Sequence, residues 1–421
     1  MRSSIRISTE SVKRLLWFGL LSPMAYVGVS AHGQEAVRMS LASAEAADAR
    51  QKAMELGYCN LKYGSVTGRV DVGAGVIYSD NVYYSENNAK GDTALRPSLG
   101  LKAIVPISDL NSLYFSTGLG YLKYLSHSDL DSFYVTPDSG LEFLVYAGDF
   151  VINTHERFAL TENGAQTPSI GSANNLGRIE NTSGVGVDWD LNKLVLSLGG
   201  DYKISQYTYS DYDYMNHDDI IFTSRAALEI NRMIKTGVEA GGGFISYETS
   251  RLSDKVNYNA GPFIEAKLSQ YLTTTLSAGY VNYDFQSGRL VNGQENLDSF
   301  YARWVTRNRL NRYLDQSISI SHNLNLGYWY EMENLYAFQY NLIYNINEKM
   351  TFYGGPYYQT GKAYYPLTGY HEDWIGINPN FDYQILKKLR ASLSYWFSQR
   401  NGDFVGGYTQ NRLALTVTYT F

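Results

Sequence analysis

The 421-residue chain has a single cysteine, nine prolines and few charged residues, and each scarcity excludes a class of protein. Cys59 has no partner for an internal disulfide, so a scaffold held by disulfide bridges is excluded. Beyond the N-terminus no apolar run reaches about 18 residues, which excludes a bundle of membrane-spanning helices. The 35 basic residues are outnumbered by 41 acidic ones, so nucleic acid is not expected as a partner.

Motifs for catalysis and for metal binding are also missing. None of the six histidines lies in a two-histidine helix motif or in a Cys/His metal spacing, and the chain has no Gly-x-Ser-x-Gly elbow. Two Ser–His neighbours occur, at Ser126–His127 and Ser321–His322, but adjacent residues of a strand point to opposite faces. We therefore predict no enzyme activity, no bound metal and no cofactor.

The first 31 residues have the three-part layout of a secretory signal peptide. A basic opening precedes an apolar run at 15–29 and a small residue at Ala31. Cleavage is predicted after Ala31 or after Gly33, and a retained membrane anchor is the alternative, which Pro23 and the short run disfavour. Residues 32–68 are predicted to be a periplasmic lead-in, with a short helix or a flexible segment at 40–57.

Residues 69–421 alternate between apolar and polar side chains with a period of two. In the last segment, 412–421, the odd positions are Leu, Leu, Val, Tyr and Phe, whereas the even positions are Arg, Ala and Thr. The same alternation recurs at 389–398, 336–346 and 113–121. Such a period predicts strands with one apolar face and one polar or small-residue face.

Two kinds of connection alternate along this region. Longer polar loops, for example at 161–178 and 285–298, lie between tight turns that follow one another about every 36 to 43 residues. A repeat of two strands, one tight turn and one long loop therefore predicts about eighteen strands, whereas a WD-type propeller of similar period needs four shorter strands per blade. The eight tight turns are predicted at 108–111, 147–150, 190–193, 231–234, 268–271, 310–313, 346–349 and 385–388.

This pattern predicts an all-β fold, a transmembrane antiparallel up-and-down β-barrel that spans 69–421. Strands of about 9 to 14 residues can cross a bilayer, and a sheet can do so only when it closes and leaves no free edge. Short periplasmic turns and long extracellular loops are typical of outer-membrane barrels. The 38 tyrosines suit two aromatic girdles, and Tyr419 with the terminal Phe421 resembles the signal that the barrel-assembly machinery reads.

A short motif follows the first predicted strand. The segment Gly75–Ser85 (GVIYSDNVYYS) places Asp80 beside Asn81, and this resembles the opening signature of the putative β-barrel porin type two family. The similarity, together with the strand period and the C-terminal Phe421, covers nearly all of 69–421. The resemblance implies a wide outer-membrane barrel, and members of that family are often linked to polysaccharide export.

If the apolar side chains face lipid, the residues of opposite parity line the lumen. A barrel of this size leaves an aqueous channel, and a basic residue that faces lipid at mid-membrane costs about 2 to 4 kcal/mol, so the parity is strongly constrained. The same parity also assigns Arg96, Lys102, Glu142, Asp201 and Arg412 to the lumen. The main pore-lining candidates carry both signs of charge: Lys203, Arg225, Glu229, Lys235, Glu239, Glu265, Lys267, Arg303, Arg307, Arg309, Asp382 and Arg390.

Two local features stand out among these strands. Arg303, Arg307 and Arg309 form a basic ladder on one face, which either attracts an anionic substrate or is neutralised by acidic residues of neighbouring strands. Around Thr154–Phe158, the parity turns Glu156 toward lipid, and we expect a bulge or a position at the membrane interface there.

A loop rich in aromatic and acidic residues is predicted at 207–219. Its tyrosines are candidates for glycan contact, because aromatic rings pack on the C–H faces of sugars while nearby carboxylates accept hydroxyl hydrogen bonds. The alternative is a tyrosine girdle that continues into a solvated loop. The candidates are Tyr207, Tyr209, Tyr212 and Tyr214.

The sequence thus predicts a water-filled barrel in the cell outer membrane. By resemblance, its cargo is an exported polysaccharide; a passive porin for small hydrophilic solutes and a surface adhesin or structural barrel are the alternatives. The expected partners are outer-membrane lipid, the barrel-assembly machinery and, for export, periplasmic polysaccharide-export components.

Overall fold

The computed structural model describes residues 61–108, 110–161, 177–286, 296–327, 331–364, 369–403 and 406–421. The predicted signal peptide and the predicted helix or flexible segment at 40–57 lie outside these ranges. Among the described residues, no helix is long and apolar enough to cross a membrane.

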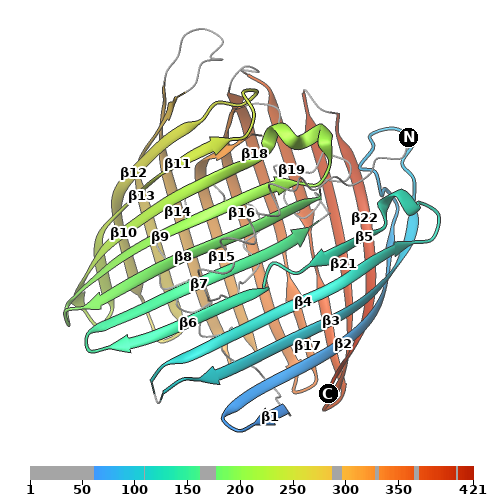
Figure 1. The fold of residues 1–421 in the computed structure, drawn as a ribbon, viewed down its shortest axis with the longest axis horizontal. Helices are drawn as coiled ribbons and strands as arrows, with labels where there is room; N and C mark the ends of the chain where they lie inside the picture. The colour runs from blue at the N-terminus through green and yellow to red at the C-terminus, as the bar shows by residue number, and fades with distance from the viewer. Residues whose placement is uncertain are drawn as a thin grey trace.

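The described chain is almost entirely β-structure, with two short 3-10 helices at Ser128–Leu130 and Ser210–Met215. The strands run antiparallel to their neighbours (Figure 1). They are β1 (Leu61–Tyr63), β2 (Val66–Ser79), β3 (Asp92–Pro106), β4 (Ser112–Tyr124), β5 (Ser132–Val135), β6 (Gly140–Ala147), β7 (Phe150–Thr161), β8 (Arg178–Asp190), β9 (Leu194–Tyr207), β10 (His217–Asn231), β11 (Ile234–Tyr247), β12 (Lys255–Lys267), β13 (Leu272–Phe285), β14 (Asn296–Asn311), β15 (Leu314–Leu326), β16 (Met332–Asn347), β17 (Met350–Gly354), β18 (Pro356–Tyr364), β19 (His371–Ile377), β20 (Asn380–Leu386), β21 (Leu389–Gly402) and β22 (Tyr408–Thr420).

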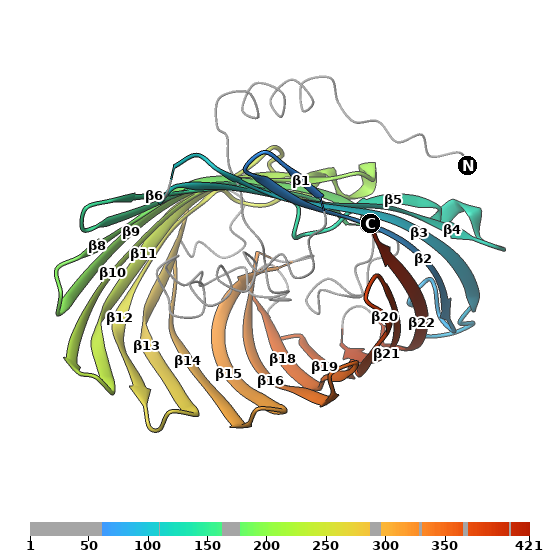
Figure 2. The ribbon, with the colours of Figure 1, turned by 90° about the horizontal axis from the view of Figure 1, so that it is seen from below.

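These segments form one closed barrel of eighteen strands. Three barrel strands are each built from two segments, namely β5 with β6, β17 with β18, and β19 with β20. The cylinder closes where β2 pairs with β22, from Asp71 opposite Thr420 to Ser79 opposite Arg412. Viewed from below, the strands surround a single interior (Figure 2). The predicted fold class is therefore confirmed, although the barrel begins at Val66 rather than at residue 69.

All eight predicted tight turns are confirmed. Each joins two neighbouring strands, as where β10 ends at Asn231 and β11 begins at Ile234. They gather at one end of the barrel, and the chain returns at the other end through the longer connections. This asymmetry is typical of outer-membrane barrels, whose short turns face the periplasm. We name the two ends periplasmic and extracellular on that basis.

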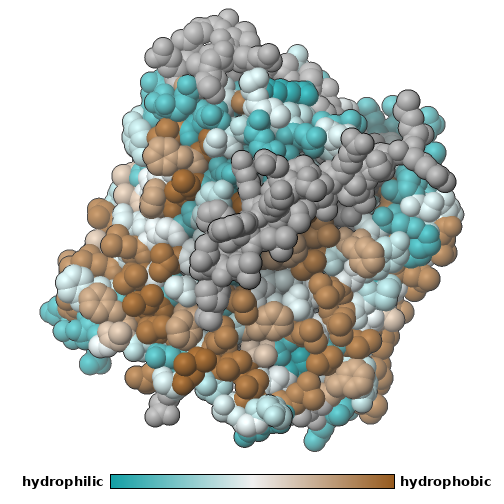
Figure 3. All heavy atoms as spheres, in the orientation of Figure 1, coloured by the Kyte–Doolittle hydropathy of each residue, from teal (hydrophilic) through white to brown (hydrophobic). Residues whose placement is uncertain are grey.

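The wall has an apolar outer face and a polar inner face. Leu198 of β9 and Val238 of β11 are 64% and 60% exposed, whereas Arg225, on the other face of β10 between them, is 5% exposed. On the side shown in Figure 3, apolar residues dominate the middle and lower wall, and hydrophilic residues gather at the upper end. An apolar exterior without a partner inside the molecule is the face that lipid covers in a membrane barrel.

Tyrosine hydroxyls mark the upper limit of this apolar exterior. Near the extracellular ends of their strands, outward-facing tyrosines donate hydrogen bonds to carboxylates of adjacent strands. Tyr202 bonds to Asp218 at 2.9 Å and Tyr358 to Asp373 at 3.0 Å, and Tyr280 bonds to Asp298 in the same way. A ring against lipid with its hydroxyl in a polar layer is the arrangement expected of an aromatic girdle.

Glycines let bulky side chains lie flat against the inner wall. Tyr301 of β14 crosses β13 and β12, and its hydroxyl donates to Glu239 Oε1 of β11 at 3.2 Å. A Cβ on Gly279 would lie 2.5 Å from the Tyr301 ring, and one on Gly261 would lie 2.7 Å from its hydroxyl. Because both positions lack a Cβ, the ring spans two strands without projecting into the interior.

The Asp80–Asn81 motif lies at the extracellular end of the closure. Asp80 accepts hydrogen bonds from the backbone N and the Nδ2 of Asn411, both at 2.7 Å. Asn81 is buried, donates from Nδ2 to the carbonyls of Ser85 and Thr409, and accepts from Gln410 through its own carbonyl. The motif therefore ties the end of β2 to β22, where the first and last barrel strands meet.

Replacing Asn81 with Ala should destabilise this closure. The substitution leaves buried carbonyls without their donor, and we expect a loss of about 1 to 3 kcal/mol in unfolding free energy. Urea unfolding of the detergent-purified barrel, followed by its heat-modifiable gel migration, measures this loss. Asn87→Ala in the same connection, where Asn87 is exposed, is the matched control; equal losses in both variants would contradict the role of the motif.

Candidate functional site

The inner wall of the barrel is the candidate site. Strand register places every predicted pore-lining residue on the face opposite the exposed apolar side chains. Lys203, Arg225, Glu229, Lys235, Glu239, Glu265, Lys267, Arg303, Arg307 and Arg309 follow one another across β9 to β14, and Asp382 and Arg390 lie on β20 and β21. Whether these residues line a conducting pore stays a prediction.

Many of these charges form ion pairs across neighbouring strands. Arg225 pairs with Glu265, two strands away, and its guanidinium lies 3.7 Å from the centre of the Phe263 ring. Three other ion pairs have longer N–O distances: Lys203–Glu180 at 3.4 Å, Arg390–Asp382 at 3.8 Å and Lys235–Glu229 at 4.0 Å. Arg309–Asp315, at 2.9 Å, lies near the periplasmic rim. Mixed signs and cross-strand pairing keep most of the inner wall electrically balanced.

The predicted basic ladder divides into two parts. Arg309 is paired with Asp315 near the periplasmic rim and its side chain is 63% exposed. In the neighbouring strands, the residues directly opposite the other two arginines carry hydroxyl side chains. Ser277 and Ser321 lie opposite Arg303, and Thr273 and Ser317 lie opposite Arg307. Arg303 also interacts electrostatically with Glu239 of β11.

Near the extracellular end, a lysine is completely buried. Lys255, at the start of β12, has a side chain with no exposed surface, and its Nζ lies 2.7 Å from Glu331 Oε2. Glu331 also accepts hydrogen bonds from the backbone N and the hydroxyl of Ser253. The contact ties the connection before β12 to the connection before β16. Sequence reasoning missed this pair, because nothing local in the sequence links residues 76 positions apart.

A second buried charge cluster lies at the same end. Arg400 of β21 contacts Glu372 of β19 at 2.6 Å, and its guanidinium lies over the Trp374 ring at 5.5 Å. Glu333 of β16 is buried and reaches over Gly361, where a Cβ would lie 1.9 Å from its Oε1. Parity alone assigns these side chains to the interior, but the sequence analysis did not single them out.

The tyrosines predicted to contact a glycan are unequally accessible. Tyr207 and Tyr214 are buried in a cluster with Met215 and Leu252. Burial raises the pKa of the Tyr214 hydroxyl to about 12, and Arg251 lies 3.8 Å from its ring centre. Tyr209 and Tyr212 are half-buried. Two of the four rings therefore hold the loop together, and the glycan role of the four stays a prediction.

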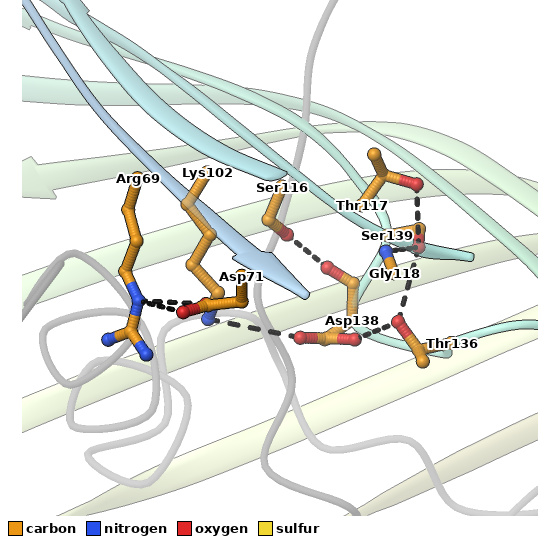
Figure 4. A network of polar contacts seen from close by, with 9 residues as sticks. All are labelled: Arg69, Asp71, Lys102, Ser116, Thr117, Gly118, Thr136, Asp138 and Ser139. Atoms are coloured by element: carbon orange, nitrogen blue, oxygen red, sulfur yellow. Dashed lines mark hydrogen bonds and ion pairs between the residues drawn. The ribbon is translucent and has the colours of Figure 1, made fainter. Parts of the chain in front are cut away.

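One barrel strand is interrupted near the middle of the wall. Between β5 and β6, residues Thr136–Ser139, called here the wall break, leave the sheet toward the lumen (Figure 4). Asp138 lies 3.9 Å from Lys102 of β3, and its carbonyl accepts a hydrogen bond from Ser116 of β4. Thr136 sits over Gly118, where a Cβ would lie 2.5 Å from its hydroxyl oxygen.

Ser139 joins the wall break to both neighbouring strands. Its hydroxyl accepts hydrogen bonds from the backbone N of Gly118 at 3.1 Å and from the Thr117 hydroxyl at 3.2 Å, both on β4. Its carbonyl accepts from the backbone N of Phe158 on β7 at 3.0 Å. Thr136 keeps one backbone bond to β4, from its N to the Gly118 carbonyl at 2.8 Å, and the Ser139 hydroxyl takes the place of a backbone acceptor for Gly118 N.

Glu156 faces outward beside this break. The register of β7 is continuous on both sides of Glu156, so the expected bulge at 154–158 is wrong. The residue also lies near the middle of β7 rather than at an end. Its carboxylate instead accepts hydrogen bonds from Asn181 Nδ2 and from the Ser183 hydroxyl of β8. Glu156, Asn181 and Ser183 are called here the outer polar patch.

The prediction that a Ser–His neighbour forms no nucleophile–base couple is confirmed for Ser321–His322. Ser321 faces the interior, whereas His322 lies on the outer face between the rings of Phe300 and Tyr336. Ser126–His127 lies outside the strands, after the end of β4, and the His127 ring contacts Asp92 Oδ2 at 2.9 Å. Within the described ranges, no group of three or more His, Cys, Asp or Glu side chains is placed to hold a metal ion.

Several solved structures superpose on most of the chain at low sequence identity. OpdQ of Pseudomonas aeruginosa superposes with a TM-score of 0.49 and 10% identity, over 85% of this chain and 97% of that one. The outer membrane protein OpdK of P. aeruginosa gives 0.49 and 11%, over 84% and 99%. OccAB3 of Acinetobacter baumannii gives 0.47 and 13%, over 84% and 99%. No protein-family model and no curated protein matches the chain.

The assignment as a membrane barrel rests on the wall itself. A closed antiparallel cylinder, an apolar exterior and tight turns confined to one end together define a barrel of the outer-membrane type. The type two resemblance finds no further support, since no family model matches.

Removing the carboxylate partner of Lys255 should destabilise the extracellular end. Glu331→Gln leaves a buried ammonium without its counter-charge, which costs about 3 to 5 kcal/mol in typical buried pairs. Thermal unfolding in detergent measures the effect, and the double variant Lys255→Met with Glu331→Gln should regain part of the loss. Glu348→Gln, in an exposed tight turn, is the control. If Glu331→Gln alone is as stable as this control, the result contradicts the pairing.

Proposed function

We propose that the chain is a passive outer-membrane channel for small hydrophilic solutes. The observation that carries the proposal is the inner wall of a closed eighteen-strand cylinder, on which ionised and hydroxyl side chains follow one another from strand to strand. Barrels of this strand number are wide enough for an aqueous passage. Balanced charges keep such a wall hydrated without binding one solute tightly.

Export of a polysaccharide, which the family resemblance implied, has weaker support. A glycan track needs accessible aromatic rings, but Tyr207 and Tyr214 are buried beneath their own loop. The basic ladder expected to guide an acidic polymer is shortened, because Arg309 is paired with Asp315. Both observations favour diffusion of small solutes over guidance of a polymer.

The first test is conductance of the purified barrel in a planar bilayer, combined with liposome swelling in sugars of increasing size. We expect open-channel currents, and swelling rates that fall as the sugar grows from a monosaccharide to an oligosaccharide. Absence of conductance, in the full-length protein and in a variant shortened in its extracellular loops, would contradict a channel. Normal conductance with loss of surface polysaccharide in a deletion strain would instead favour export.

The second test concerns charge selectivity. Arg303 and Arg307 place two positive charges on the inner wall away from the rim, so we expect them to contribute to the attraction of anions. The double variant Arg303→Gln with Arg307→Gln should shift the reversal potential in a salt gradient toward cation preference. Arg309→Gln, which alters the ion pair at the rim, should shift it less. Equal shifts in the two variants would refute a special role for the two inner arginines.

A further inference from the structure

The outer polar patch is an exception on the outside of the barrel. Among the described strands, outward-facing charged residues such as Asp218, Asp298 and Asp373 lie within three residues of a strand end. Glu156 is the exception, since it faces outward near the middle of β7. Hydrocarbon surrounds that level of a membrane barrel, and an ionisable group there indicates a functional site.

The outer polar patch and the wall break are adjacent. Gly140, the first residue after the break, lies opposite Arg157, and Leu141 lies opposite Glu156. On β8, Asn181 lies opposite Phe158, whose backbone N donates to Ser139. The place where the wall departs from a regular sheet is thus the place where its outer face is polar.

Polar groups continue from the break into the lumen. Asp138 projects inward to Lys102, and the inward-facing Arg157 is the neighbour of Glu156 along β7. Hydrogen-bonding groups therefore occur on the outer face, within the wall and on the inner face at one level. Figure 4 shows the inner part of this series, from Ser139 through Thr136 and Asp138 to Lys102.

The wall is also interrupted on its other side, but there the two bent strands bond directly to each other and the outer face beside the bend carries no charged residue in the described strands. Between β17 and β18 and between β19 and β20, the chain bends at Gly355 and at Asn378. The two residues bond directly, from Gly355 N to Asn378 Oδ1 at 3.1 Å and from Asn378 N to the Gly355 carbonyl at 3.3 Å. No charged residue faces outward beside this bend in the described strands. A bend in the wall by itself therefore does not require a polar exterior.

We propose that the wall break is a lateral passage, through which an amphipathic molecule moves between the lumen and the surrounding membrane. Movement of the Thr136–Ser139 segment away from β4 breaks the two bonds of the Ser139 hydroxyl, the bond from Thr136 N to the Gly118 carbonyl and the bond from Ser116 to the Asp138 carbonyl. The moving molecule substitutes for these bonds as it passes.

The chemistry of the lining indicates the class of molecule. Glu156 and Asp138 place carboxylates on the two sides of the wall. Glu156 accepts hydrogen bonds from Asn181 and Ser183, and Asp138 accepts one from Thr136, but each carboxylate has lone pairs for a further donor. A head group that donates hydrogen bonds, such as an amine or a hydroxyl, fits these acceptors. The molecule also needs an apolar body, because the outer end of the passage opens among lipid-facing side chains.

A reversible disulfide across the break tests the passage. The Thr117 and Ser139 hydroxyl oxygens lie 3.2 Å apart, so Thr117→Cys with Ser139→Cys, in a Cys59→Ser background, should join β4 to the break. The probe is N-phenylnaphthylamine, an apolar amine that fluoresces in hydrocarbon. In cells producing the oxidised variant, probe uptake should fall to the level of cells without the barrel. A phosphine reductant should restore it.

A second disulfide controls for cross-linking itself. Thr274 and Thr306 face outward opposite each other on the regular pair β13 and β14, with hydroxyl oxygens 2.9 Å apart. Thr274→Cys with Thr306→Cys should leave probe uptake unchanged. Unchanged uptake in the oxidised Thr117–Ser139 variant, or an equal fall in both variants, would overturn the proposal.

Two further measurements separate the passage from the channel. Salt conductance of the oxidised Thr117–Ser139 barrel should match that of the unaltered protein, since small ions leave through the periplasmic end. Glu156→Leu, which removes the outward carboxylate without a cross-link, should lower probe uptake while heat-modifiable migration shows a folded barrel. Unchanged uptake in this variant would also count against the proposal.

Discussion

The structure depends on one constraint: every backbone N–H and C=O group within the hydrocarbon layer must find a partner inside the protein. A sheet meets this condition only when its first and last strands pair, as β2 and β22 do over nine residue pairs. Further hydrogen bonds support the pairing at both ends. Asp80 and Asn81 hold the extracellular end, and at the periplasmic end the backbone N of Phe421 donates to the Val70 carbonyl at 2.9 Å.

Closure of the barrel also determines which side chains face lipid and which face the interior. With lipid outside, each strand places its apolar residues outward, and charged residues collect inside, where they pair across strands as Arg225 does with Glu265. The same crowding explains the glycines of the inner wall. Tyr301 reaches Glu239 across two strands only because Gly261 and Gly279 leave room beneath its ring. The inner surface is therefore polar and locally smooth, which suits the passage of solutes.

Between β4 and β8 the wall departs from this order on its outer face as well as in its backbone ladder. There the Ser139 hydroxyl accepts the hydrogen bond from Gly118 N that a backbone carbonyl would accept in a regular strand. Glu156 faces outward and accepts hydrogen bonds from Asn181 and Ser183. Each feature would be costly in hydrocarbon if it stood alone. Because the two features are adjacent, the proposed polar route through the wall accounts for both of them.

The alternation of residues by itself determined the fold class, the eight tight turns and the face on which each charge lies, because strand period and turn chemistry are local properties. Only the tertiary structure decided which charges meet. Lys255 and Glu331 are brought together by closure, and Tyr207 and Tyr214 are buried by packing of their own loop against Leu252. The interruption at Thr136–Ser139 also escaped the sequence pattern, since its neighbours on β4 and β7 are set by long-range register. The expected bulge at Glu156 was wrong for the same reason: the partners that satisfy its carboxylate lie on the next strand, more than twenty residues away.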